Sequence, residues 1–215
     1  MYYKMNVRRL VLQLLCWVVV AVFFTACQKS KSGDPVFQLL RKDVTGLDFE
    51  NVLRQSGAFN VFNYMYFFNG GGVAAGDFNN DGLVDLYFTS NMGPNKMFLN
   101  EGNLKFKDIT EQAGTAGMDG WTTGVSVVDI NNDGMLDLYV GQLGEYQNIK
   151  GQNQLFVCKS IDNGVPVYAD EAIYYKLDLV GFATQAVFFD YDLDGDLDLF
   201  QLNHSVHHNG TFGPR

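Results

Sequence analysis

Short apolar runs separated by turn-forming residues make up most of the chain, and one long apolar run lies near its start. Residues 10–26 are apolar apart from Gln13 and Thr25. Beyond them, apolar runs of about four to eight residues are bounded by Gly, Asn and Asp, which is typical of β-strands. Residues 36–53 could hold one short helix, but no later stretch keeps an apolar period near 3.6 residues. We therefore predict an all-β fold after the apolar start.

Three segments repeat the order of apolar strand, acidic loop and second strand. They span residues 72–87, 124–139 and 184–200, and their first acids are 52 and then 61 residues apart. Residues 95–113 and 153–172, which lie between them, each predict a further strand, a polar turn and another strand. Four strands per repeat of about 40–60 residues are typical of β-propeller blades. No such hairpin follows the third segment, so we predict a partial β-propeller of about two and a half four-stranded blades and expect an N-terminal fragment of a longer propeller.

The acidic loops share the pattern D-x-[DN]-x-D-G-x-x-D, which predicts cation sites. Side-chain oxygens at positions 1, 3 and 5 point to one centre, glycine at position 6 allows a sharp turn, position 7 offers its carbonyl, and position 9 closes the cage. Eleven of the 24 acidic residues lie in these loops, where they would repel one another without a counter-ion. The predicted ligands are Asp77, Asn79, Asp81, the Leu83 carbonyl and Asp85; Asp129, Asn131, Asp133, the Met135 carbonyl and Asp137; and Asp190, Asp192, Asp194, the Asp196 carbonyl and Asp198.

Oxygen ligands without His or Cys favour Ca²⁺, with Mg²⁺ as second choice, and predict about three sites. An EF-hand would need Glu at position 12, which here is Phe88, Val140 and Gln201. The alternative is that Asp, Asn and Gly merely form turns. Three loops with matching spacing favour the cation, held in a β-hairpin loop.

The N-terminus resembles a secretory signal with a lipid-attachment site. Lys4, Arg8 and Arg9 precede the apolar run, and small residues lead to Cys27. In such signals the cysteine is lipidated, so we predict a lipoprotein signal peptide at residues 1–26, a tether and N-terminal segment at 27–45, and the repeats at 46–215. An uncleaved anchor helix and a soluble secreted protein are the alternatives. The predicted location is the bacterial cell envelope, anchored at the outer membrane with a periplasmic or surface face.

Composition and motifs narrow the classes of function. A net charge of −9 argues against nucleic-acid binding, which needs clustered Lys and Arg. The three cysteines form no disulfide framework or CxxC site, and Cys158 suits a buried apolar position. We find no hydrolase elbow, P-loop, zinc-protease or dinucleotide-binding motif, which predicts a protein that is not an enzyme.

The loops resemble the FG-GAP/VCBS repeats of integrin-α-type β-propellers. Residues 95–100 and 106–114 are similar to the repeat unit of bacterial VCBS-repeat proteins with an ASPIC/UnbV-type C-terminus, although no such C-terminal segment is present. The resemblance covers about residues 46–212. It implies a propeller, typically of about seven blades, whose cations usually brace the blades.

Two other groups of residues have a structural and a functional interpretation. His204, His207 and His208 could form a zinc site or a polar loop at the rim of a blade. Tyr64, Tyr66, Phe67, Phe68 and Trp121 could stack on sugars or pack between blades.

These features together predict a lipid-anchored, calcium-binding propeller module for adhesion or for binding a glycan or protein ligand. The alternatives are a propeller-scaffold enzyme that acts on glycans through acids such as Glu145 or Glu171, and a fragment without autonomous function.

Overall fold

The computed structural model describes residues 36–204. The chain divides into two units, 1–40 and 41–215; of the first, residues 36–40 are described, and they are exposed and contain no helix or strand. The predicted signal at 1–26 and the predicted lipid site at Cys27 lie outside the described residues. Within residues 36–204, no helix is long and apolar enough to cross a membrane.

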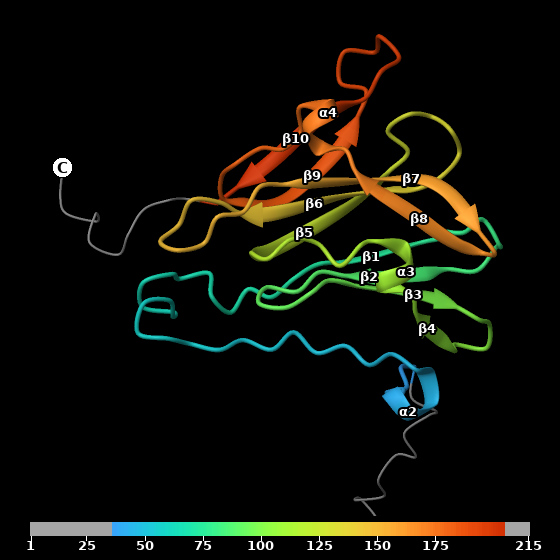
Figure 1. Ribbon diagram of the computed structural model, residues 1–215, viewed down its shortest axis with the longest axis horizontal. Helices are drawn as coiled ribbons and strands as arrows, with labels where there is room; N and C mark the ends of the chain where they lie inside the picture. Colours follow the sequence, from blue (N-terminus) through green and yellow to red (C-terminus); the bar gives the residue numbers. More distant parts are fainter. Residues whose placement is uncertain (1–35, 205–215) are drawn as a thin grey trace, which may run out of the picture. The chain divides into compact units, whose positions relative to one another are not determined.

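The unit that begins at Arg41 is nearly all β-structure, as predicted (Figure 1). Ten strands form three antiparallel sheets within the described residues. The first sheet has the order β1-β2-β3-β4, the second β5-β6-β7-β8, and the third consists of β9 and β10. The strands are β1 (Val73–Gly76), β2 (Asp85–Phe88), β3 (Lys96–Asn100), β4 (Phe106–Asp108), β5 (Trp121–Val128), β6 (Asp137–Leu143), β7 (Gln154–Asp162), β8 (Val165–Asp170), β9 (Ala183–Phe189) and β10 (Asp198–Asn203).

Apolar contacts stack the three sheets in sequence order. One core cluster joins the first sheet to the second, with Tyr87 and Met97 facing Val125 and Phe156. Another joins the second sheet to the third through residues that include Tyr139 and Ala186. The second sheet therefore has a neighbour on each face, and Figure 1 shows it between the other two.

A third core cluster lies at one end of this stack. Phe59, Tyr64 and Phe67, which precede β1, pack with Trp121 and Leu143 of the second sheet. The chain from residue 53 onwards is thereby fixed against the sheets before the first strand begins. This packing places the aromatic run beside the starts of the inner strands β1, β5 and β9.

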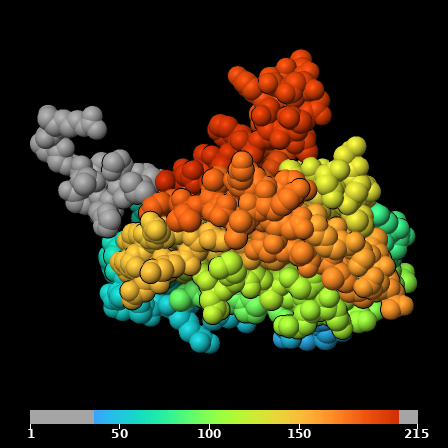
Figure 2. Space-filling model, turned by 45° about the horizontal axis from the view of Figure 1, so that its top comes forward, coloured from blue at the N-terminus to red at the C-terminus, as the bar shows by residue number. Residues whose placement is uncertain are grey.

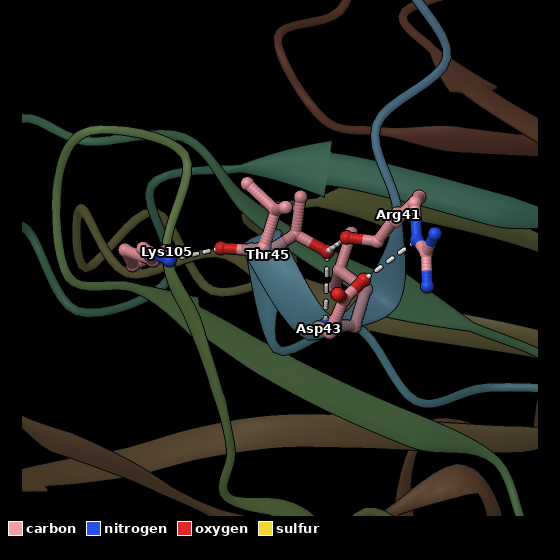
Figure 3. A network of polar contacts seen from close by, with 6 residues as sticks. Arg41, Asp43, Thr45 and Lys105 are labelled. Atoms are coloured by element: carbon pink, nitrogen blue, oxygen red, sulfur yellow. Dashed lines mark hydrogen bonds and ion pairs between the residues drawn. The ribbon is translucent and has the colours of Figure 1, made fainter.

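Three one-turn helices complete the unit. They are α2 (Lys42–Thr45), α3 (Thr110–Ala113) and α4 (Ala172–Tyr175). The short helix that the sequence allowed within residues 36–53 is α2, and Lys105, in the turn between β3 and β4, donates to the Val44 carbonyl at its end (Figure 3). The sequence did not predict α3 and α4, because four residues are too few to show a helical period.

Candidate cation loops

The three acidic loops connect the first two strands of each sheet in the same register. The residue before each loop pairs with the last acid of its motif: Gly76 with Asp85, Val128 with Asp137, and Phe189 with Asp198. The repeat predicted from the sequence therefore places each acidic motif at the tip of an antiparallel hairpin.

The first aspartate of each motif closes the turn through its two carboxylate oxygens. Asp77 accepts from the backbone N–H of Asp81 at 2.9 Å and of Gly82 at 2.7 Å. Asp129 accepts from the backbone of the two equivalent residues of the second loop at 3.0 and 2.9 Å, and Asp190 does so in the third loop at 3.2 and 3.1 Å. The glycine at position 6 has a φ of +82° to +96° in every loop, a conformation that favours glycine. The turn predicted from the motif is thus formed three times.

The third position of the motif differs between the loops in a way that matters for charge, whereas the fifth is aspartate in all three. Asn79 donates its amide to Asp81 at 3.0 Å, and Asn131 donates to Asp133 at 2.8 Å, so an amide partly offsets one carboxylate. In the third loop an aspartate replaces this asparagine. Carboxylate oxygens of Asp190, Asp192 and Asp194 all lie within 4.8 Å of one another.

Such crowding of like charge favours a bound cation. Two carboxylates about 4 Å apart repel by about 4 kcal/mol at an effective dielectric constant of 20. The charge and hydrogen bond of Asp194 raise the pKa of Asp196. In Figure 2 the hairpin that carries this loop, drawn in orange-red, projects into solvent, and residues 191–197 are all exposed.

The last aspartate of the motif has a structural role that the spacing did not reveal. Asp85 is fully buried and accepts from the Phe78 N–H at 2.9 Å and from the Asn100 N–H of β3 at 2.7 Å. Asp137 repeats this arrangement with Ile130 at 2.9 Å and Cys158 at 2.8 Å. Each carboxylate therefore ties its loop to the third strand of its own sheet.

Burial is the main influence on the ionisation of these two residues. It raises the pKa of Asp85 and Asp137, although the two backbone hydrogen bonds of each oppose this change. The other acids of the loop raise the pKa of both further. A cation beside the loop would counteract this repulsion and favour the ionised carboxylates.

The donor chemistry of the loops fits calcium. Every side chain at positions 1, 3, 5 and 9 of the motif offers a carboxylate or amide oxygen, and none offers nitrogen from His or sulfur from Cys. Calcium takes six to eight such oxygen ligands in flexible geometry. Exposed carboxylates at the hairpin tips remain open to an ion from solvent.

The first and second loops also touch across the sheet boundary. The Asn80 amide donates to the Gly134 carbonyl at 3.4 Å, and the Asn79 amide donates to the Gly164 carbonyl, in the turn between β7 and β8, at 3.0 Å. The conformation of the first loop is therefore stabilised by contacts with the second loop and with the β7–β8 turn of the second sheet.

The other candidate residues fall into different environments. Tyr64, Phe67 and Trp121 are buried, in keeping with the packing interpretation, whereas Phe68 is exposed. His204 contacts aromatic rings, and His207 and His208 lie outside the described residues. Glu171 pairs with Lys159 at 2.6 Å, and Glu145 is exposed in the loop after β6.

Comparison with known proteins supports the repeat. Residues 77–140 match the FG-GAP-like repeat family, which confirms the resemblance over the first two loops. The chain is similar to cartilage acidic protein 1 of Homo sapiens, at 31% identity over 139 residues, and of Xenopus tropicalis, at 29% over 134 residues. These alignments cover 63% and 62% of the chain but 20% of each relative, so the chain spans about a fifth of the length of these relatives.

Proposed function

We propose that this chain is a calcium-braced β-propeller module that binds a ligand outside the cytoplasm. The observation that carries the proposal is the threefold recurrence of one oxygen-rich hairpin turn, with three crowded carboxylates in the third loop. The FG-GAP-like match over residues 77–140 supports a binding module rather than an enzyme.

Each loop would hold one calcium ion through the oxygens at positions 1, 3, 5, 7 and 9. The ion would neutralise the acids and fix the hairpin tip against the neighbouring sheet. Its contribution is structural, so the ligand is expected to bind elsewhere on the stack. If calcium binds only the folded chain, each site stabilises the fold by about 2.7 kcal/mol when the free calcium concentration is 100 times the dissociation constant.

A calcium titration of the full chain tests this proposal. We expect isothermal calorimetry to detect about three sites, and we expect EDTA to lower the melting temperature and Ca²⁺ to restore it. Asp192→Ala should remove one site, while Asp119→Ala, an exposed acid outside the loops, should leave the stoichiometry unchanged. Absence of calcium uptake by the folded chain would refute the proposal.

The proposal includes a lipid anchor at Cys27 and a location in the bacterial cell envelope. It rests on the basic start, the apolar run and the small residues before Cys27. The similarity of residues 95–114 to bacterial VCBS-repeat proteins of the ASPIC/UnbV-associated type belongs to the same proposal. Expression in bacteria with a labelled fatty acid should label the wild-type chain and not Cys27→Ala; equal labelling of both would contradict the anchor.

A further inference from the structure

A cavity of about 250 Å³ lies where the starts of the inner strands meet the aromatic run. Its wall combines residues that precede β1 with the first residues of β5 and β9 and with the last described residue after β10. None of the predicted cation ligands lines it. We propose that this cavity binds one ring of a neutral sugar, and this inference rests on the proposed role of the chain as a binding module.

The first element of the site is a fixed aromatic platform. The Tyr66 ring is half-buried and stacks on the His204 ring, with the centroids 4.1 Å apart and the planes 30° from parallel. The Tyr64 hydroxyl lies 2.9 Å from His204 Nε2, and Phe182 packs against the same imidazole edge-on. These contacts hold the platform in place before a ligand arrives, which limits the entropy lost on binding.

The second element is a part of the cavity wall where glycine lets neighbouring strands approach closely. A side chain at Gly71 would lie 2.2 Å from the Thr89 carbonyl, and one at Gly124 would lie 2.2 Å from Gln185 Oε1. Gln185 Nε2 donates to the Val125 carbonyl at 3.1 Å, which orients the amide so that Oε1 faces Gly124. The cavity wall therefore combines these glycines with Gln185, whose amide is held in one orientation, beside the aromatic platform.

Charge and exposure decide which ligand class fits. Among the described residues 36–204, no Asp, Glu, Lys or Arg lines the cavity, and the chain carries a net charge of −9, which disfavours an anion. A quaternary ammonium would need several open aromatic faces, but Tyr64 and Trp121 are 4% and 2% exposed. The half-buried Tyr66 ring, together with the uncharged hydrogen-bonding residues of the lining, matches the apolar face and hydroxyl rim of a neutral sugar.

The size of the cavity limits the ligand to a single ring. Pockets for drug-sized molecules occupy about 300–1,000 Å³, and this cavity is smaller. An affinity on the order of millimolar is expected for so few atoms. A longer glycan would extend into solvent and gain little from the cavity itself.

Saturation-transfer NMR of the full chain with the methyl glycosides of glucose, galactose, mannose and N-acetylglucosamine tests the inference. At least one probe should bind saturably, and Tyr66→Ala should weaken it by about tenfold while Tyr66→Phe retains it. Tyr174→Ala, which alters a 78% exposed tyrosine on α4, should leave binding unchanged. Gln185→Leu, at an exposed position, should weaken binding while the chain remains folded, as a cooperative melting curve would show.

Three results would overturn the inference: no saturable binding of any probe, equal binding by wild type and Tyr66→Ala, or displacement of every sugar by choline at lower concentration. Calcium uptake is measured separately, and the cavity does not include the loops. A chain that takes up calcium but binds no sugar would therefore refute this site alone, and a chain that binds sugar but takes up no calcium would refute the cation proposal alone.

Discussion

At the scale of single residues, the last aspartate of each motif links the loop to the sheet. Asp85 and Asp137 are completely buried, and each accepts one N–H from its loop and one from the third strand. Asp198 is half-buried and accepts from Tyr191 at 2.9 Å. Within the described residues, it has no third strand beside it. The same motif position therefore stabilises the first two sheets more than the third.

We expect Asp137→Ala to destabilise the protein by about 2–4 kcal/mol even in EDTA, because it leaves two buried N–H groups without a partner. Asp198→Ala is the matched control and should cost less than half as much in EDTA, since it frees one N–H in an exposed turn. Urea unfolding of both variants provides the comparison. Equal losses would show that the two carboxylates act in the same way.

Motif spacing predicted the loop residues but not this role. The first loop is a continuous segment, so the positions of its ligands and of Gly82 follow from local sequence. The partner of Asp85 is the N–H of Asn100, which reaches it only through the pairing of β2 with β3. A partner set by tertiary packing cannot be read from the spacing within the motif.

At the scale of elements, the second strands of the three sheets are equivalent but differently covered. The second residue after the last aspartate is Tyr87 in β2, Tyr139 in β6 and Phe200 in β10. Tyr87 and Tyr139 are 0% and 1% exposed, whereas Phe200 is 61% exposed. Tyr139 also donates to the Leu177 carbonyl at 3.1 Å. These differences show which sheet faces have a neighbour within the described residues.

Truncation at these equivalent positions should therefore give different losses. We expect Tyr139→Ala to destabilise the protein by about 3–5 kcal/mol, because it opens a cavity between the second and third sheets. Phe200→Ala should change stability by about 1 kcal/mol or less, since most of the ring is already in water. Denaturant unfolding at fixed calcium tests the pair. A large loss in Phe200→Ala would mean that this face is covered in solution.

A second element-scale feature is the ion pair that supports the turn into α3. Asp108 accepts from the Thr110 N–H at 3.0 Å and from Lys96 at 2.9 Å. Burial raises the pKa of Asp108, but the hydrogen bonds from Thr110 and Lys96 outweigh it and lower the pKa overall. The ionised form is therefore favoured by folding.

This shift predicts a dependence on acid pH. Because the folded pKa lies below the unfolded value of about 3.9, the contribution is present above that value and is lost as pH falls through the folded pKa. Urea midpoints in EDTA should therefore fall more steeply below about pH 4 for wild type than for Asp108→Asn. Asp119→Asn, at an exposed site, is the control and should follow the wild-type curve.

The order of strands was predictable because each sheet is formed by one continuous segment of the chain, with strands that are consecutive in sequence pairing with one another. Alternating apolar residues, turns and a recurring motif were sufficient for four strands in each of the first two repeats and two in the third. The sequence analysis did not predict the one-turn helices α3 and α4. Asp108 and Asp170 each accept the N–H of the first helical residue, and Gly114 and Lys176 end the turns at positive φ. These are single-residue signals that a periodicity analysis does not detect.

At the scale of the whole compact unit, stability should follow the number of covered sheet faces. The second sheet packs against a neighbour on both faces, and every residue of β6 is buried. The third sheet has a described neighbour on one face, and none of the six residues of β10 is buried. In stacked repeats each unit is stabilised mainly by its interfaces with the next.

Hydrogen exchange measured by mass spectrometry on the full chain in calcium should reveal this gradient. Amides of β6 and β7 should exchange slowest, those of β10 fastest, and those of the first sheet at an intermediate rate, because local opening costs least where few apolar contacts are lost. Chelation should speed exchange in the loops at 77–85 and 129–137 more than in β6. Protection of β10 equal to that of β6 would contradict the gradient and would show that its exposed apolar face is covered in solution, since an uncovered two-stranded sheet cannot retain its amide hydrogens as long as a sheet packed on both sides.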